Sequence, residues 1–216
     1  MSKAYDRVNI FMLQKAMARL KIPSPFITFI TNLFTNCTNQ IFTYHGTTNP
    51  YNVLVGIDQG EVICPLLWCI YYDPLLCHIQ NQPDLGYRLS HSWSSTATGP
   101  IDQSLSVDIS DTAFIDDTTW ITSSQSNMES ILSIVDSFFI LNDIQINDDK
   151  AILLTNDQLS DSREAQFNLP TRQLTIKAHP VHASERVLGV WITLQHFDKF
   201  IIQQIKQEIS QVCDAL

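Results

Sequence analysis

Glycine is scarce in this sequence, with six residues among 216, and long apolar runs are absent. The longest apolar stretch falls short of the about 20 residues that a helix needs to span a membrane, and the N-terminus lacks the pattern of a signal peptide. Hydrophobic residues make up 44% of the chain, which is ordinary for a folded protein and too high for a disordered one. These features predict an intracellular globular protein.

Cysteine pairs at the spacing of a zinc site are also missing. The cysteines are odd in number and widely spaced, which favours reduced thiols over a disulfide framework. Three of them fall in one apolar segment, where packing is the expected role. The five are Cys37, Cys64, Cys69, Cys77 and Cys213. The histidines are scattered, and we assign them no ligand role.

Basic residues are few: 13 lysines and arginines stand against 22 aspartates and glutamates, which gives a formal net charge of −9. A free-standing nucleic-acid-binding protein normally carries a basic face. The charge therefore argues against a chain that binds nucleic acid by itself. The length is sufficient for one sizeable core with, at most, an appended element.

Apolar periodicity predicts helices at residues 8–20, 24–36, 63–79, 128–141 and 197–212. Strand signals fall at residues 40–44, 51–55, 106–114, 118–122, 151–155, 173–177 and 186–192. Ser24 and Asn127 are expected N-caps, and residues 90–99 and 157–168 are expected loops. The third helix is apolar all round, which predicts burial beneath a sheet, with a kink at Pro74. Helices on one face of a mainly antiparallel sheet define an α+β fold.

Two adjacent carboxylates, Asp116 and Asp117, stand between two apolar runs. This pattern predicts a hairpin with a tight turn at residues 115–117, so that both acids lie close together at its tip. Like charges at this distance repel unless cations hold them. Carboxylate oxygens suit Mg²⁺ or Mn²⁺, and a two-metal site with ions about 3.5–4 Å apart serves in-line phosphoryl transfer. The alternative is a pair of solvated turn residues, since a second such pair occurs at Asp148 and Asp149.

Several short segments follow one another in a recognisable order. The first three are SKAYDRV (residues 2–8), VGIDQGEV (55–62) with CPLL (64–67), and AFIDD (113–117). Later come IN (146–147) with Lys150, and then VLGV (187–190). In this order and spacing the set resembles the palm of reverse transcriptases, most closely those of non-LTR retrotransposons. The resemblance covers nearly the whole chain, and the combination is far more specific than any single segment.

The resemblance implies a polymerase palm, an antiparallel sheet backed by helices, within an incomplete right hand. Residues 1–194 would form the palm, and residues 195–216 would form the start of a thumb helix. It also implies an RNA template, a DNA primer and a deoxynucleoside triphosphate as partners, Mg²⁺ or Mn²⁺ as the cofactor, and no association with a membrane.

The resemblance further assigns roles in the chemical step. Asp116 and Asp117 match the paired carboxylates that hold the catalytic divalent ions. Lys150 matches a lysine near the triphosphate, where its charge would neutralise the leaving phosphates. Without the resemblance, a lysine at this position would be read as a solvated surface residue.

Other matched residues would contact the nucleotide and the primer. Tyr5 matches the aromatic residue beneath the sugar of the incoming nucleotide, where its edge excludes a 2′-hydroxyl. Gln59 and Gly60 match the Gln-Gly beside the nucleotide and template, and a glycine lets backbone approach a base pair closely. Leu188 and Gly189 match the strand turn that grips the primer end. Read alone, these residues would be packing and turn residues.

The sequence departs from the family pattern in several places. In the family, the first segment begins with a metal-binding Asp immediately before the residue aligned with Met1, so we expect little or no polymerase activity from this chain alone. Asp58 stands where the family usually carries a basic residue, and Ile115 occupies a variable position beside the acids. The basic fingers are also outside this sequence, in keeping with its acidic charge.

We therefore expect a partial RNA-directed DNA polymerase of a retroelement, which transfers a nucleotide to a primer 3′-hydroxyl with two divalent ions. One alternative is a non-catalytic palm remnant that acts as an interaction or scaffold module. Another is an unrelated Mg²⁺-dependent phosphotransferase or hydrolase that uses the adjacent carboxylates. The Gln59-Gly60 and Leu188-Gly189 segments, present in the expected order, count against the latter.

Overall fold

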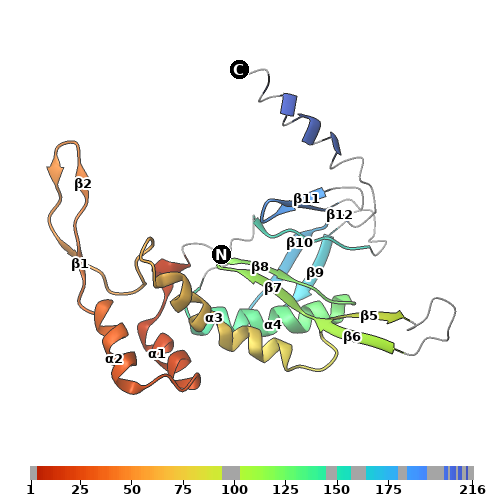
Figure 1. Ribbon diagram of the computed structural model, residues 1–216, viewed down its shortest axis with the longest axis horizontal. Helices are drawn as coiled ribbons and strands as arrows, with labels where there is room; N and C mark the ends of the chain where they lie inside the picture. Colours follow the sequence, from red (N-terminus) through yellow and green to blue (C-terminus); the bar gives the residue numbers. More distant parts are fainter. Residues whose placement is uncertain are drawn as a thin grey trace. The chain divides into compact units, whose positions relative to one another are not determined.

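The computed structural model describes residues 4–93, 103–144, 150–156, 164–179 and 184–193, together with residues 202–203, 205–207, 209–210 and 213 (Figure 1). The chain divides into two compact units. One contains Met1–Ile146 and Leu169–Thr171, and the other contains Asn147–Asn168 and Arg172–Leu216. The predicted boundary between palm and thumb, at residues 194 and 195, lies outside the described residues and stays a prediction.

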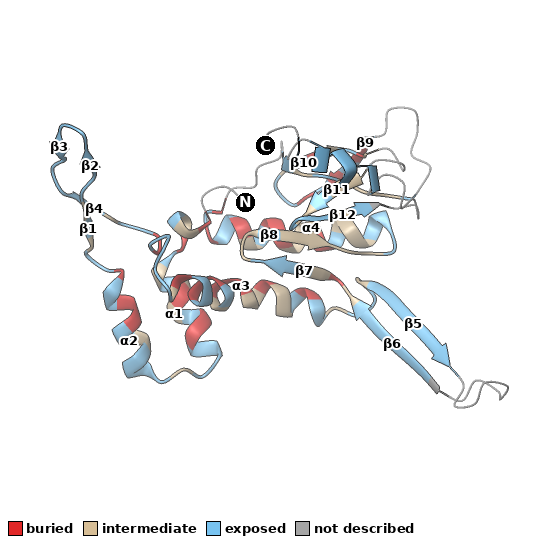
Figure 2. Ribbon diagram, turned by 45° about the horizontal axis from the view of Figure 1, so that its top comes forward, coloured by how far each residue is buried: buried red, intermediate tan, exposed pale blue. Residues whose placement is uncertain are grey.

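The helices of the first unit build its core. They are the 3₁₀ turn η1 (Tyr5–Arg7) and the α-helices α1 (Ile10–Arg19), α2 (Ser24–Leu33), α3 (Cys64–Gln80) and α4 (Gln125–Leu141). Buried residues gather mainly on α1, α3 and α4 (Figure 2). Leu13, Leu75 and Ile131, one from each of these helices, are almost fully buried. Burying such a side chain contributes about 1.5–3 kcal/mol before the cost of ordering it is counted.

Helix α3 supplies the largest share of this core from one broad face. Its buried residues recur at intervals of three and four: Cys64, Leu67, Trp68, Tyr71, Tyr72, Leu75 and Ile79. The opposite face is also apolar in sequence, yet Leu66 on it is 59% exposed. The predicted helix is therefore confirmed, while its predicted burial on all sides is wrong, because α1, α4 and the hairpin above α3 cover only one side of it.

The strands of the first unit pair as antiparallel ladders. These are β1 (Thr38–Asn39) with β4 (Tyr51–Asn52), β2 (Phe42–Thr43) with β3 (Gly46–Thr47), β5 (Tyr87–Trp93) with β6 (Gln103–Ile109), and β7 (Asp111–Phe114) with β8 (Asp117–Trp120). The β5–β6 ladder is exposed along its length (Figure 2). The β7–β8 hairpin is hydrogen-bonded to Trp68 and Tyr72 of α3, so this hairpin is the one that concerns the candidate site.

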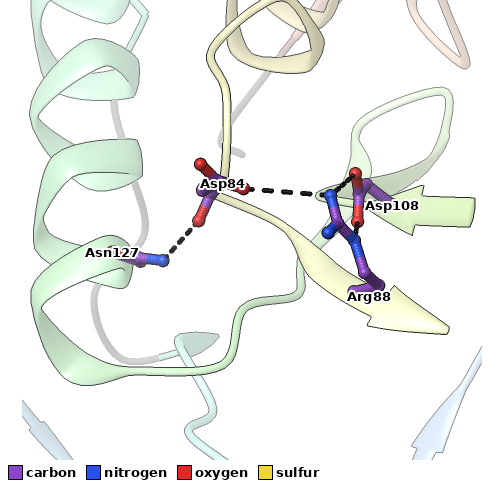
Figure 3. A network of polar contacts seen from close by, with 4 residues as sticks. All are labelled: Asp84, Arg88, Asp108 and Asn127. Atoms are coloured by element: carbon purple, nitrogen blue, oxygen red, sulfur yellow. Dashed lines mark hydrogen bonds and ion pairs between the residues drawn. The ribbon is translucent and has the colours of Figure 1, made fainter.

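A polar network closes the base of the β5–β6 hairpin (Figure 3). The Arg88 guanidinium donates two hydrogen bonds to the carboxylate of Asp108, at 2.8 and 2.9 Å, and lies 3.8 Å from a carboxylate oxygen of Asp84. The hydrogen bonds from Arg88 lower the pKa of the Asp108 carboxyl. The Asn127 side chain donates to the Asp84 carbonyl at 2.7 Å, and this bond ties α4 to the start of the hairpin.

The second unit contains two more antiparallel ladders among its described residues. Strand β9 (Glu164–Asn168) pairs with β10 (Gln173–Lys177), and β11 (Ser184–Val187) pairs with β12 (Val190–Thr193). Residues 153 and 178 form an isolated parallel bridge. The described residues between 202 and 213 are helical, as the sequence predicts for this stretch. No helix in the described part of either unit is long and apolar enough to cross a membrane.

The mixture of helices and antiparallel strands confirms the α+β class. The sequence also predicts one antiparallel sheet, but the described strands pair as six separate two-stranded sheets. The predicted strand at 106–114 is interrupted at Ser110, where the chain leaves the β5–β6 ladder and enters the β7–β8 ladder. The Ser110 carbonyl accepts a hydrogen bond from the Ile121 N–H at 2.8 Å and so belongs to the second of these hairpins.

Three further predictions about local structure are wrong. Residues 90–93, expected in a loop, belong to β5, and residues 164–168, expected in another loop, form β9. Both stretches are ordered by pairing with the next strand along the chain. The remainder of each predicted loop lies outside the described residues. The predicted strand at 151–155 is reduced to the single bridge at residue 153.

Both expected N-caps are also wrong. Ser24 is the first residue of α2, and the cap position before it is Pro23, which offers no side-chain acceptor. In α4 the cap is Ser124, whose hydroxyl accepts a hydrogen bond from the Asn127 N–H at 3.2 Å. Asn127 lies inside the first turn, with its side chain directed to Asp84. Asn9, by contrast, caps α1 by accepting from two backbone N–H groups.

We expect Gly56→Ala to destabilise the first unit strongly. Gly56 has φ 99°, and a Cβ there would lie 2.9 Å from the carbonyl oxygen of Asp6, which is backbone and cannot rotate away. An alanine forced into positive φ costs more than about 1 kcal/mol, and the backbone clash adds to this cost. Thermal or urea unfolding of the full chain measures the loss.

Gly46→Ala is the matched control. Gly46 also has positive φ, 117°, but a Cβ there meets no atom within 4 Å. The control carries the conformational cost without the clash, so equal destabilisation by the two substitutions would contradict a close approach between residues 6 and 56.

Candidate functional site

The predicted acidic hairpin is present, with its acids at the tip. Phe114 of β7 pairs with Asp117 of β8, which leaves Ile115 and Asp116 as the two residues of the turn. Asp116 is partly buried and Asp117 is exposed. Ile115 has φ 55°, a conformation that β-branched residues rarely adopt. The turn is therefore one residue tighter than predicted, and it depends on support from its surroundings.

That support comes from the aromatic residues of α3. The indole N–H of Trp68 donates a hydrogen bond to the carbonyl of Ile115 at 2.7 Å. Next to it, the hydroxyl of Thr118 on β8 lies 3.3 Å from the hydroxyl of Tyr72. Burial raises the pKa of Tyr72, so this phenol stays protonated. Two polar contacts thus fix the turn and the start of β8 on a buried helix.

Tyr5, near the start of the chain, also contacts Trp68. It lies in η1, and its ring meets the ring of Trp68 edge to face, with centroids 5.9 Å apart and an interplanar angle of 74°. The pKa of Tyr5 is raised, first by burial and then by the charges of Cys64, Cys69 and Asp116. Tyr5 therefore lies within the electrostatic field of Asp116, and Trp68 contacts both Tyr5 and the Ile115 carbonyl of the acidic turn.

The loop that carries Gln59 and Gly60 is attached to η1 rather than to the hairpin. The Gly56 N–H donates to the Val8 carbonyl at 2.9 Å, and the Ile57 N–H donates to the Tyr5 carbonyl at 3.0 Å. Beyond these anchors, Gln59 and Gly60 are exposed. Gly60 has φ 110°, and no atom lies within 4 Å of where its Cβ would be. The loop thus presents open backbone beside the Tyr5 segment.

Asp58, which departs from the family pattern, is exposed in the same loop. Its charge contributes to the environment of the buried Cys64 at the start of α3. The pKa of the Cys64 thiol is raised, first by burial and then by the charges of Asp58 and Glu61. This thiol is accordingly protonated and unreactive, as expected for a cysteine that packs in a core.

Lys150, Leu188 and Gly189 lie in the second unit. Lys150 is exposed. Leu188 and Gly189 form the two-residue turn between β11 and β12, with φ values of 50° and 84°. Positive φ at both positions matches the tight turns that right-twisted strands favour. The predicted turn is thus present at the expected residues, and the contacts of these three residues with nucleotide and primer stay predictions.

The donor set at the hairpin tip fits a hard divalent cation. Asp116 and Asp117 offer carboxylate oxygens, the ligands that Mg²⁺ and Mn²⁺ prefer. Across the described residues, no group of three or more His, Cys, Asp or Glu side chains is arranged to hold a metal ion. Mg²⁺ is commonly held by one or two carboxylates, with substrate phosphates and water completing its shell. The pair therefore suits a metal that arrives with a phosphate ligand.

Sequence reasoning missed the residue that joins these parts. Trp68 lies in the predicted buried helix, but we assigned it no role. The available signal was its indole N–H, which needs an acceptor when buried and so sets a tryptophan apart from the surrounding leucines. Tyr71, one turn further along α3, was missed in the same way: its hydroxyl donates to the side chain of Asn142 at 2.8 Å.

The class of protein follows from the match of the chain to a known family. Residues 1–192 match the family described as "Reverse transcriptase (RNA-dependent DNA polymerase)". The match covers most of the chain, so the chain belongs to the reverse transcriptase family. The resemblance inferred from the ordered segments is confirmed, and the alternative of an unrelated phosphotransferase loses its support.

A curated relative narrows the comparison. The chain is similar to the "Retrovirus-related Pol polyprotein from type-1 retrotransposable element R2" of Popillia japonica, with 26% identity over 154 residues. The aligned region is 71% of this chain and 20% of the relative. The chain therefore spans about a fifth of the length of that polyprotein.

We expect Asp116→Asn to lower the pKa of Tyr5. The charge of Asp116 opposes ionisation of the phenol, so its removal makes the tyrosinate easier to form, while burial still holds the pKa above the ordinary value. Because the folded state favours the protonated phenol, its contribution to stability is present below the pKa of an unfolded tyrosine and is lost as the pH rises through the folded value. Ultraviolet titration of tyrosinate measures the shift, with Tyr5→Phe identifying the signal.

Asp143→Asn provides the control for this titration. Asp143 is an exposed acid of the same unit that pairs with Arg7, and it does not contribute to the pKa of Tyr5. The same downward shift in both variants would contradict the placement of Tyr5 beside the acidic turn.

Proposed function

We propose that this chain is the palm portion of a retrotransposon reverse transcriptase, of the non-LTR type. Its chemistry is nucleotidyl transfer to the 3′-hydroxyl of a DNA primer, directed by an RNA template. Membership of the reverse transcriptase family supports the reaction, and similarity to an R2 polyprotein supports the type of element. The observation that carries the proposal is the contact of Trp68 with both Tyr5 and the Ile115 carbonyl next to Asp116, which joins two segments far apart in sequence.

In this proposal Asp116 and Asp117 hold two divalent ions, Mg²⁺ or Mn²⁺. When bound, such ions stabilise charge on the attacking and leaving oxygens of an in-line displacement. The partly buried Asp116 is fixed by its turn, and the exposed Asp117 is accessible to phosphate. The acidic charge of the chain, −9, makes cations necessary before a nucleic acid can approach this surface.

The remaining residues shape the nucleotide and primer sites. The edge of Tyr5 would contact the sugar of the incoming nucleotide, and the open backbone at Gln59 and Gly60 would admit the base pair with the template. Lys150 would neutralise the leaving phosphates, and the Leu188-Gly189 turn would contact the primer end. Since the chain spans about a fifth of its relative, the template, primer and nucleotide remain partners proposed for the whole protein.

A non-catalytic scaffold is the second candidate. The exposed apolar side chains of the first unit favour it, because large exposed apolar areas commonly mark interaction surfaces. On α2 and the β2–β3 hairpin these include Phe26, Phe29, Leu33 and Phe42, all at least 48% exposed. A scaffold would retain the fold without needing either carboxylate for its activity.

We expect the double substitution Asp116→Asn and Asp117→Asn to weaken Mn²⁺ binding by at least about tenfold, since even the loss of a residue behind the ligands costs a metal site about 10–100-fold. The concentration of free Mn²⁺, followed by electron paramagnetic resonance, measures the affinity. The same double substitution at Asp148 and Asp149 removes equal charge elsewhere in the sequence and serves as the control. Equal losses for both pairs would reduce the effect to non-specific charge and contradict a site at the turn.

Primer extension on an RNA template tests the activity itself. We expect little or no extension from this chain alone. In a longer form that is active, we expect Asp117→Asn to abolish extension, because the substitution removes a ligand of the ions that stabilise both reacting oxygens. The assay compares this chain with a longer form that carries sequence upstream of Met1, each with Mn²⁺ and with Mg²⁺. Extension that survives Asp117→Asn would contradict the proposed chemistry. Folded protein that extends no primer in either form would favour the scaffold.

A further inference from the structure

Trp68 makes a contact that simple packing does not require. Its side chain is 1% exposed, and its indole N–H donates to the carbonyl of Ile115, 47 residues away, at 2.7 Å. That carbonyl belongs to the residue immediately before Asp116. Ile115 is held at φ 55°, and a β-branched residue in this region is strained by about 1–3 kcal/mol. The turn therefore needs an external contact to hold it in this conformation.

The indole ring is itself fixed by aromatic neighbours. It stacks on Tyr72 with centroids 5.5 Å apart and planes 18° apart, and it lies 5.9 Å from Tyr71 at 40°. Tyr72 in turn contacts Thr118 of β8. A ring held on two sides has one orientation available, and in that orientation its N–H points at the acidic turn. The direction of the hydrogen bond is thus set by the packing of α3.

The same ring also forms an edge-to-face pair with Tyr5, with centroids 5.9 Å apart and planes at 74°. Edge-to-face pairs of this kind contribute about 0.5–1.5 kcal/mol beyond their buried area, and they have a preferred geometry. One side chain therefore contacts both the residue matched to the nucleotide sugar and the turn that carries the carboxylates. A displacement of the indole would move both at once.

We propose that Trp68 is a positioning residue of the nucleotidyl-transfer site. It holds the Ile115 carbonyl so that the Asp116 carboxylate faces the metal, and it fixes Tyr5 at the distance from that metal which the nucleotide sugar requires. The inference rests on the proposed function, and it adds a residue outside the ordered segments that carry the resemblance. Its consequence is that loss of the indole N–H weakens metal binding.

The test compares Trp68→Phe with Tyr71→Phe in the full chain. Trp68→Phe keeps an aromatic ring and removes the N–H. Tyr71→Phe removes a buried hydroxyl from the same helix. That hydroxyl donates to Asn142 at 2.8 Å and accepts from the Asn9 N–H at 3.3 Å, so its bonds lead to the end of α4 and to the start of α1 rather than to the acidic turn. We expect Trp68→Phe to weaken Mn²⁺ binding about tenfold, as residues that orient metal ligands do, and Tyr71→Phe to leave it unchanged. Equal weakening by both variants would overturn the proposal.

A metal-free measurement separates this inference from the proposed function. In ¹⁵N-correlated NMR spectra, Trp68→Phe should shift the amide resonances of Tyr5 and Asp116 and leave that of Asn142 in place. Tyr71→Phe should shift the amide resonances of Asn9 and Asn142 and leave that of Asp116 in place. If the wild-type chain binds no Mn²⁺, the proposed metal chemistry fails, and the amide shifts still decide whether Trp68 positions the turn. Unchanged Tyr5 and Asp116 resonances in Trp68→Phe would overturn the positioning role.

Should Trp68→Phe fail to fold, the wild-type protein provides the answer. The chain has four tryptophans, so the Trp68 indole resonance is identified by elimination with Trp93→Phe, Trp120→Phe and Trp191→Phe. Mg²⁺ should shift the Trp68 indole resonance and not that of Trp93 on β5, and Asp116→Asn should abolish the shift. If Mg²⁺ is shown to bind at the turn and the indole resonance of Trp68 does not shift, the proposal is overturned.

Discussion

The buried face of α3 is the constraint on which the first unit depends. Trp68, Tyr71 and Tyr72 are each nearly fully buried, and each carries one polar atom that must find a partner. Their partners are the Ile115 carbonyl, the Asn142 side chain and the Thr118 hydroxyl. Because these partners lie on the acidic hairpin and at the end of α4, the need to satisfy three polar atoms fixes how both elements pack on the helix.

Residues near the start of the chain are also held by hydrogen bonds to α3 and to the residues just after α4. The Asn9 N–H donates to the hydroxyl of Tyr71 at 3.3 Å, and Arg7 contacts Asp143 just beyond α4. The loop before α3 then closes onto η1 through the Gly56 N–H. Three stretches of the reverse transcriptase pattern therefore meet on one helix. The buried aromatic residues of that helix, which make the contacts, lie outside the matched segments.

Much of the local structure could be predicted because its causes are local. The periodicity of α1, α3 and α4, the strand β10 and the Leu188-Gly189 turn all lie where the sequence places them. The errors arose where a hydrogen-bonding partner, rather than the residue's own sequence neighbourhood, decides the local structure. Residues 90–93 are ordered by pairing with β6, the strand at 106–114 is divided because Ser110 also serves the next hairpin, and Asn127 gives up the cap position to bond Asp84.

The sequence by itself determined the family, since the order and spacing of short segments persist whatever the surroundings. It also determined that two adjacent acids stand at a turn, because apolar runs flank them. Only the tertiary structure decided that Tyr5 lies in the field of Asp116, and that Trp68 contacts both Tyr5 and the Ile115 carbonyl. The physical reason is that a buried indole N–H must be bonded but can donate to any carbonyl within reach, so the choice of Ile115 is made by how the helix and the hairpin pack together.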